Sequence, residues 1–245
     1  MNLAFTGAAP RRAAGERSGV STHAHTAELR VRRQSAGEPA ADWLAEIRRF
    51  RAEVFYDRGR RPGFQVGDAE FDDPQDLDLD AFHLTAYVPD REELAACVRL
   101  APPGAAARFQ VREHLGEQAY TRLLAEIGAD PASLFEAGRL VVAPWTRGRG
   151  LGARMVAAVM AAGQALGASI MLCTSGTDDG QDTLFGRLGW LPCPGTERYS
   201  AHYRDTVRVL AHRVSEGAYE FEAVAARLRR HLVDLPRAEA TRVPL

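Results

Sequence analysis

The sequence predicts one α/β domain in which a mixed central β-sheet is flanked by helices on both faces. Segments with strand-like and helix-like hydrophobic spacing alternate along most of the 245 residues. Hydrophobic residues make up 46% of the chain, which is enough to fill a sizeable core. Neither an internal repeat nor a second group of core-forming elements is present in the sequence, so a single domain is expected.

The two ends of the chain differ in composition from the part between them. Residues 1–34 are dominated by Ala, Gly, Ser, Thr and Arg, and we predict a disordered or weakly ordered tail there. They contain no apolar segment of the kind that a secretory signal requires. The folded domain is expected over residues 35–235, and a polar C-terminal tail over residues 236–245.

The first half of the domain predicts a helix, a long connection and a strand pair. Between residues 40 and 58 apolar side chains recur three and four positions apart, which predicts a helix. Residues 60–80 are polar and crowded with acids, and a connection of about 20 residues is long enough to be functional or mobile. Residues 82–88 and 93–100 have the composition of strands, and Pro89-Asp90 between them predicts a hairpin.

The second half alternates predicted strands and helices. Residues 109–114 fit either a helix or a loop, and Gly167 and Gly189 each end a helical pattern. The predicted strands cover residues 134–143, 169–174, 197–203 and 206–214, and the predicted helices cover residues 120–127, 153–166, 182–188 and 218–232.

Composition argues against several classes of function. The chain has 31 basic and 32 acidic residues, so its net charge of -1 gives no reason to expect nucleic-acid binding. No apolar run is long enough to span a membrane. The three cysteines are odd in number and widely spaced, which argues against a disulfide framework or a metal site and fits a cytoplasmic protein.

The most informative segment runs from Val141 to Gly152. An apolar strand-like run ends at Pro144, a glycine-rich basic turn follows, and a helix then begins. Such a turn lets backbone N–H groups approach phosphates, and the helix N-terminus and arginine side chains favour anions. We therefore predict a site for the phosphates and pantetheine arm of an acyl donor, formed by Val141, Val142, Arg147, Gly148, Arg149, Gly150, Leu151 and Gly152.

Other interpretations of this turn fit less well. A phosphate-binding loop of the Walker type would end in Gly-Lys-Ser or Gly-Lys-Thr, which is absent. A dinucleotide-binding turn would have a different glycine spacing and an acid about 20 residues later. A plain strand-to-helix turn beside surface arginines remains the alternative.

The motif Arg147-x-x-Gly150-x-Gly152 resembles the acyl-CoA loop of the GNAT acyltransferase superfamily. Within that superfamily, four earlier segments resemble, in order, those of N-acyl amino acid synthases and acyl-homoserine-lactone (autoinducer) synthases. They are Arg51-x-x-Val54-Phe55, the acidic Glu70-Phe71-Asp72 before Ala81-Phe82-His83-Leu84, Cys97-Val98-Arg99-Leu100, and Phe135-Glu136-Ala137-Gly138-Arg139-Leu140.

This resemblance implies a GNAT-like domain and an N-acyltransferase. It also implies acyl-CoA or acyl-carrier protein as co-substrate, with no tightly bound cofactor and no metal. Two departures place the chain between the two groups and put lactone formation in doubt. Gly138 stands where these families usually have Ser, and the Arg147 to Gly152 loop is intact, whereas lactone synthases often degrade it.

Aminolysis of a thioester requires a deprotonated amine, a stabilised oxyanion and a departing thiol. Glu136 is the candidate base, directly or through a water, and Arg139 is the second candidate catalytic residue. Ion pairing of Glu136 with Arg139 or Arg99 is the alternative, and both roles can coexist. Backbone N–H groups at residues 140–142 are the candidate oxyanion donors.

Four residues are predicted to bind the acceptor: Arg51, Phe55, Asp72 and Arg99. The alternative is an ion-pair network, with Asp72 and Asp73 as partners, that only holds the acidic segment in place.

Many GNAT enzymes protonate the leaving thiolate with a tyrosine, but the corresponding residue here is Phe185. We therefore expect either unassisted departure or another donor, such as Tyr199 or Tyr203. Cys173 lies within an apolar strand, and a buried hydrophobic role is favoured over a nucleophilic one.

The leading hypothesis is transfer of an acyl group from an acyl-carrier-protein or CoA thioester to the amine of an amino-acid-like acceptor. Three alternatives stay open. They are an acyl-homoserine-lactone synthase that uses S-adenosylmethionine, an acetyl-CoA-dependent N-acetyltransferase for small amines, and a non-catalytic sensor of acyl thioesters.

Overall fold

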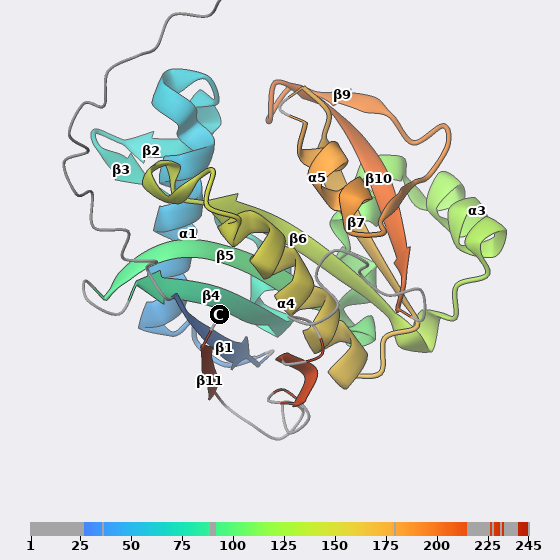
Figure 1. The fold of residues 1–245 in the computed structure, drawn as a ribbon. Helices are drawn as coiled ribbons and strands as arrows, with labels where there is room; N and C mark the ends of the chain where they lie inside the picture. The colour runs from blue at the N-terminus through green and yellow to red at the C-terminus, as the bar shows by residue number, and fades with distance from the viewer. Residues whose placement is uncertain are drawn as a thin grey trace, which may run out of the picture.

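The computed structural model describes residues 27–35, 37–88, 92–178, 180–214, 226, 228–230, 232 and 240–244 (Figure 1). Its strands are β1 (Glu28–Gln34), β2 (Gln65–Gly67), β3 (Glu70–Phe71), β4 (Ala81–Val88), β5 (Glu93–Ala101), β6 (Leu134–Val142), β7 (Ile170–Gly176), β8 (Leu191–Pro192), β9 (Arg198–Ser200), β10 (Asp205–Arg213) and β11 (Ala240–Pro244). The α-helices are α1 (Asp42–Tyr56), α2 (Gln110–Leu115), α3 (Glu117–Ile127), α4 (Leu151–Ala165) and α5 (Gln181–Arg187).

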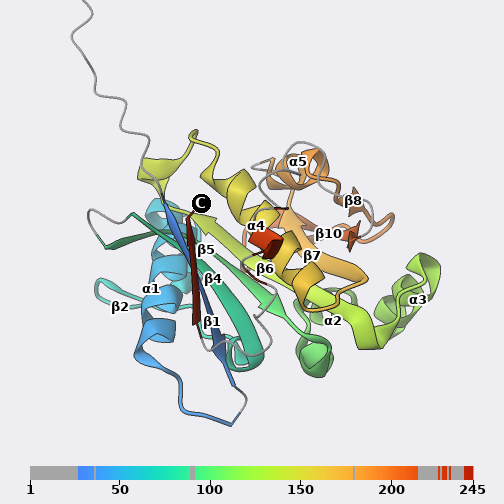
Figure 2. The same cartoon turned by 60° about the horizontal axis from the view of Figure 1, so that its bottom comes forward.

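Among the described residues, nine strands form one sheet in the order β11-β1-β4-β5-β6-β7-β10-β8, with β9 paired to β10 (Figure 2). Neighbouring strands are antiparallel, apart from the parallel pair β6 and β7. The predicted mixed sheet and the predicted hairpin, now β4 and β5, are confirmed.

Side-chain alternation along the central strands distributes the helices over both faces. On β5, Val98 packs in the cluster that includes α4, whereas its neighbour Cys97 packs in the cluster that includes α1. Helices α2 and α3 pack on the α1 side, against the ends of β6 and β7. The helices therefore lie on both faces of the sheet, as predicted.

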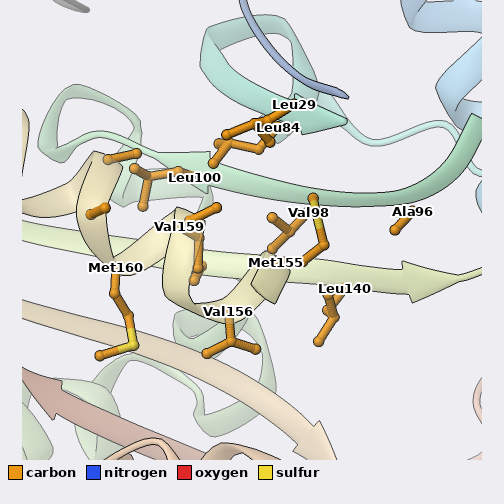
Figure 3. Packing of buried hydrophobic residues seen from close by; sticks show 14 of the residues in the cluster. Leu29, Leu84, Ala96, Val98, Leu100, Leu140, Met155, Val156, Val159 and Met160 are labelled. Carbon is orange, nitrogen blue, oxygen red and sulfur yellow. The ribbon is translucent and has the colours of Figure 1, made fainter. Parts of the chain in front are cut away.

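Helix α4 is buried along most of its length because it crosses the middle of the sheet. Met155, Val156 and Val159 have no measurable exposure, and they pack against Val98 and Leu140 (Figure 3). The many alanines of this helix let its backbone approach the strands closely. The core between α4 and the central strands β5 and β6 is thus a tightly packed layer.

The prediction of a disordered tail through residue 34 is wrong for its last part, because residues 28–34 form β1. Leu29 and Val31 have 0% exposure, and every β1 residue pairs with β4. The three arginines of β1 place their guanidinium groups over aromatic rings. That of Arg30 lies 4.1 Å from the ring centre of Tyr87. A period-two apolar pattern was hidden by arginine-rich composition. Residues 1–26 lie outside the described part of the chain.

Two other predictions change in the same way. Residues 240–244 form β11, which pairs with β1, so the predicted polar C-terminal tail includes a strand. The predicted loop over residues 60–80 instead contains regular structure. It forms the β2–β3 hairpin and short 3-10 helices at Pro62–Phe64 and Asp76–Asp80. Of the predicted helix over residues 218–232, the described residues are helical, and the remaining ones lie outside the described part.

Leu29 provides a test of β1. Replacing Leu29 with Ala is expected to lower the free energy of unfolding by about 2–5 kcal/mol, because it leaves a cavity in the core beside Leu84 (Figure 3). The matched control Leu191→Ala removes the same atoms from a side chain that is 61% exposed, and a change within about 0.5 kcal/mol is expected. Urea denaturation measures both. Equal, small effects would show that β1 does not belong to the core.

Candidate active site

The strand β6 contains one extra residue beside β5. Cys97 is opposite Val141 and Arg99 is opposite Gly138, so Arg139 and Leu140 together face Val98. Arg139 has a positive φ of 58°, which is rare for a residue with a side chain. This is a β-bulge, a feature that redirects a strand and is frequent beside active sites.

Beyond the bulge, β6 and β7 separate. Their parallel pairing covers only residues 134–136 and 170–172, although β7 continues along β10 to Gly176. Figure 1 shows β7 and β10 turning away from β6 toward the top of the view. Side chains reach two β6 carbonyls instead: Gln181 donates to Leu140 at 3.4 Å and Arg147 donates to Val142 at 3.3 Å.

These two contacts establish the direction of the β6 backbone in the gap. A strand residue presents its N–H and its C=O to the same side. The N–H groups of Leu140 and Val142 therefore point into the gap, away from β5. They are donors of the kind that can bind a pantetheine amide or an oxyanion.

A cavity of about 530 Å³ lies between the separated parts of β6 and β7. Its apolar wall is formed by Val54, Phe55, Leu140, Val141, Val142, Leu184, Phe185 and Val207. Its polar lining includes Asp57, Arg60, Arg61, Gln110, Arg139, Arg147, Gln181, Tyr203 and Asp205. An apolar slot with groups of both charges at its ends suits an acyl thioester and a charged acceptor.

The predicted phosphate-binding turn lies at the edge of this cavity. Arg147 and Gly152 line it, and Gly148 and Gly150 both have a φ of 76°, which glycine adopts without strain. Helix α4 begins at Leu151, so its N-terminal amides face the turn. Arg149 is exposed, and its carbonyl accepts a hydrogen bond from Arg154. Of the predicted donor-binding residues, four line the cavity, namely Val141, Val142, Arg147 and Gly152, and the other four are their neighbours along the chain.

A buried group of charges lies behind the wall of the cavity, with Asp78 at its centre. Its Oδ1 accepts from Arg51 Nη1 at 3.0 Å and from Arg99 Nη1 at 2.9 Å, and its Oδ2 accepts from Arg51 Nη2 at 2.7 Å. Burial by itself would raise the pKa of Asp78, but these two guanidinium groups outweigh it and hold that pKa well below its usual range. Asp78 is therefore ionised at any moderate pH.

Asp73 connects this group of charges to the bulge. Its Oδ2 lies 2.9 Å from Arg51 Nε and 3.1 Å from Arg139 Nε. Arg139 in turn contacts the hydroxyl of Tyr203 with its Nη1. Helix α1, the acid-rich segment, β6 and the turn before β10 are tied together by these contacts.

Glu136 lies on β6, two residues before the cavity-lining Gly138, and is 1% exposed. Its Oε2 accepts the Val111 N–H at 2.8 Å, and its Oε1 is 3.9 Å from Arg99 Nη2. Burial raises the pKa of Glu136 to about 7, despite the opposing charge of Arg99. Of the two partners considered from the sequence, Arg99 is the one that the structure places beside this carboxylate.

Gly138 lies two residues after Glu136 on β6. A Cβ atom at Gly138 would lie 3.4 Å from Gln110 Oε1 and 3.6 Å from Arg99 Nη2. Gly138 and Gln110 both line the cavity. A side chain at position 138 would therefore contact Gln110 and Arg99, and Arg99 is the ion-pair partner of Glu136.

The residues predicted to bind the acceptor are divided by the structure. Phe55 lines the cavity, but Arg51 and Arg99 are 1% exposed and engaged with Asp78 behind its wall. Asp72 makes none of the ion pairs with Arg51, Arg99 or Arg139, which belong to Asp73 and Asp78. The structure therefore places Phe55 at the cavity and does not place Arg51, Asp72 or Arg99 among its lining residues.

The two tyrosines that are candidates for the proton donor differ in their position. Tyr199 is 68% exposed, whereas Tyr203 lines the cavity. Phe185 is 4% exposed with its ring 5.3 Å from that of Trp190. Burial raises the pKa of the Cys173 thiol well above its usual value, which agrees with a packing role for Cys173. Arg61, Gln181 and Asp205 also line the cavity, and no sequence motif singled them out.

Two further properties concern only the described residues. No three His, Cys, Asp or Glu side chains among them come together in an arrangement that could hold a metal ion. No helix in that part of the chain is long and apolar enough to cross a membrane.

Comparisons with known proteins agree with this architecture. Residues 50–157 match the family model of an acetyltransferase (GNAT) domain, and a search of the curated proteins finds no match. The structure of TofI in a ternary complex with an inhibitor and MTA is 19% identical with a TM-score of 0.54, over 80% of this chain and 96% of that one.

Two other solved structures carry more descriptive names. BjaI with MTA, a CoA-dependent acyl-homoserine lactone synthase, is 16% identical with a TM-score of 0.53, over 76% of this chain and 82% of its own. FeeM, an N-acyl amino acid synthase from uncultured soil microbes, is 14% identical with a TM-score of 0.52, over 78% and 91%. At such identities the likeness shows a shared fold, and the family match over residues 50–157 includes the GNAT motif from Arg147 to Gly152.

Asp78 offers a test of the buried charges. Asp78→Asn is expected to lower the free energy of unfolding by about 3–5 kcal/mol at about pH 7, because it leaves buried guanidinium groups without their anion. The matched control is Asp76→Asn, an exposed position in the same 3-10 helix, where little change is expected.

The pH dependence of stability gives a second readout. Because folding lowers the pKa of Asp78, its contribution is present above the unfolded value of about 3.9 and is lost as the pH falls below it. Wild type should therefore lose more stability than Asp78→Asn between about pH 5 and 2 in urea denaturation. Parallel acid profiles for the two proteins would contradict this role of Asp78.

Proposed function

We propose that this chain, whose residues 50–157 match a GNAT acetyltransferase domain, transfers an acyl group from a pantetheine thioester to the amine of an amino-acid-like acceptor. The thioester is carried by CoA or by an acyl-carrier protein, and both present the same pantetheine arm. The single observation that supports this proposal most is the cavity between β6 and β7, which begins at the glycine-rich turn. We place the reaction in the cytoplasm, where free cysteines such as those of this chain stay reduced.

The acyl donor enters the cavity from the end at which α4 begins. Its phosphate groups lie at the amides that begin α4, beside Arg147. The pantetheine arm follows β6, where the N–H groups of Leu140 and Val142 point into the gap. The thioester carbonyl then reaches the bulge, and a β6 N–H stabilises the oxyanion that forms when the amine attacks.

The acceptor occupies the opposite end of the cavity, between Phe55 and the charged groups. Asp57 and Asp205 are anionic partners for an ammonium, and Arg61 and Arg139 are cationic partners for a carboxylate. Groups of both signs in one cavity suit a zwitterion better than a simple alkylamine. An amino acid or a close relative is therefore the acceptor class that this end favours.

Glu136 acts as the base through a water that occupies the space beside Gly138. The carboxylate itself lies behind Gly138 and Gln110, so it reaches an acceptor nitrogen only through such an intermediary. Its pKa of about 7 keeps a large ionised fraction at neutral pH while making it a stronger base than an ordinary carboxylate. Arg99 supplies the charge that holds the ionised form in place.

Lactone formation remains the second candidate function. The fold likeness to BjaI favours it, but the intact turn from Arg147 to Gly152 favours the N-acyl amino acid synthases. Acetylation of a small amine would require only a short acyl group, and a sensor would bind donor without turnover.

A product screen by mass spectrometry tests the proposal. Acetyl-CoA, long-chain acyl-CoA and long-chain acyl-carrier protein are each paired with an amino-acid mixture or with S-adenosylmethionine. The expected product is an N-acyl amino acid, because the cavity holds a thioester and charged groups of both signs. An acyl-homoserine lactone would select the second candidate. Acetylated amines alone would point to a general acetyltransferase, and donor binding without product to a sensor.

The ionisation of Glu136 predicts a pH profile. As the pH rises through about 7 the base form accumulates, so kcat/KM of the wild type should rise and then level off. Glu136→Gln keeps an oxygen for the Val111 N–H but removes the base, and a loss of about 10²–10⁴-fold with no rise near pH 7 is expected. The control Glu126→Gln changes an exposed carboxylate on α3. A wild-type profile in Glu136→Gln would rule out this base.

A further inference from the structure

Thioester aminolysis leaves a thiolate that must gain a proton, and the function proposed above does not say from where. We propose that Tyr203 is the general acid that protonates the departing sulfur. This inference rests on the proposed function, because it concerns the same cavity and the same bond.

The groups that line the cavity leave few alternatives among the described residues. Asp205 accepts the N–H groups of Thr177 and Asp178 with its Oδ1, and its Oδ2 lies 3.8 Å from Arg61 Nη2, so this carboxyl group is already engaged as an acceptor. Cys173 is a buried thiol, and the hydroxyl of Thr174 is far too weak an acid for this task. A phenol ionises near pH 10 in water and a thiol near 8.5, so of these groups a tyrosine is the best matched to a thiolate.

The guanidinium groups of the cavity keep their protons. Burial lowers the pKa of Arg139 to about 10, and the neighbouring carboxylate of Asp73 opposes that shift. Arg139 thus stays charged at neutral pH. It serves the step as a fixed positive charge beside the proton donor.

The aromatic packing around Tyr203 fixes the position of its hydroxyl. Its ring centre lies 6.0 Å from that of Phe55 on α1, 6.0 Å from that of Phe64 and 4.9 Å from that of His202. Its backbone carbonyl accepts Arg61 Nε at 2.6 Å. The turn between β9 and β10 is thereby held against α1, and the hydroxyl is held at the cavity.

Tyr203 and Arg139 meet across the opening between the separated strands. Arg139 comes from the bulge of β6, and Tyr203 comes from the turn that leads into β10. The hydroxyl contacts Arg139 Nη1. A positive charge therefore lies where negative charge develops when the hydroxyl gives up its proton.

By the sequence resemblance, Phe185 on α5 stands where many GNAT enzymes have the tyrosine that protonates the thiolate. Its ring packs against Trp190 in the core. Phenylalanine has no proton to give. Tyr203 approaches the same cavity from a different element, the β9–β10 turn.

The acceptor nitrogen forms a bond to the thioester carbonyl carbon, and the tetrahedral oxyanion collapses with cleavage of the C–S bond. The electron pair of that bond goes to sulfur, which takes the proton of the Tyr203 hydroxyl and leaves as a thiol. Arg139 holds the resulting phenolate, which regains a proton from solvent, while Glu136 takes the proton that the nitrogen releases. Thioester and amine become amide and thiol.

The test uses Tyr203→Phe, which keeps the ring and removes only the hydroxyl. Thiol release and amide formation are measured with an acyl-CoA and with the same acyl group on 4-nitrothiophenol, a thiol that departs without protonation. With acyl-CoA we expect kcat to fall by about 10²-fold or more while the KM for the donor stays unchanged. With the nitrothiophenyl ester the loss should shrink to roughly tenfold or less. The control Tyr199→Phe should match wild type with both donors.

Every other outcome is informative. Equal losses with both donors would make Tyr203 a positioning residue, and no loss with acyl-CoA would assign the proton to another group; either result overturns the proposal. Wild type that releases thiol but forms no amide would contradict the proposed function, while the ratio between donors would still test Tyr203 through hydrolysis. Wild type that releases no thiol from either donor would overturn both. Thermal unfolding of Tyr203→Phe near that of wild type excludes misfolding as the cause.

Discussion

The extra residue in β6 is the constraint on which the active-site region depends. It turns β6 away from β7, so that backbone groups of Leu140 and Val142 face a cavity instead of a neighbouring strand. A positive φ at Arg139 costs about 1–3 kcal/mol. The ion pair of its guanidinium with Asp73 and its contact with Tyr203 offset this strain. The strand separation is thus maintained by side chains from two other parts of the chain, the acid-rich segment and the turn before β10.

Burial divides the charged residues into two groups with different roles. Asp78 and its arginine partners have almost no exposure, and they hold α1, the acid-rich segment and β5 together behind the cavity. This network explains why the long segment between α1 and β4 is an ordered wall and not a mobile loop. Arg139 belongs to both groups, because one part of its guanidinium pairs with Asp73 and another faces the cavity. A change in the network therefore reaches the reaction site through Arg139.

Local patterns predicted what local sequence determines. The spacing of α1 and α4, the β4–β5 hairpin and the glycine-rich turn were all visible because each lies in one contiguous stretch. Strand β1 was missed because arginines outnumber the apolar residues that face the core. Asp78 could not be separated from Asp72, because ion pairing depends on how a 3-10 helix meets α1 and β5. Tyr203 could not be separated from Tyr199, since the direction of a turn decides which ring faces the cavity. The bulge could not be predicted, because the residue with the positive φ is Arg139 and not a glycine.

A crystal structure of the protein with CoA bound tests most directly whether the bulge creates the donor site. We expect the phosphates at the amides that begin α4 and the pantetheine arm between β6 and β7. The sulfur should lie at the bulge, near Arg139 and Tyr203. Observation of β6 and β7 paired along their full length, or of CoA bound outside the gap, would contradict the claim that the bulge creates the donor site.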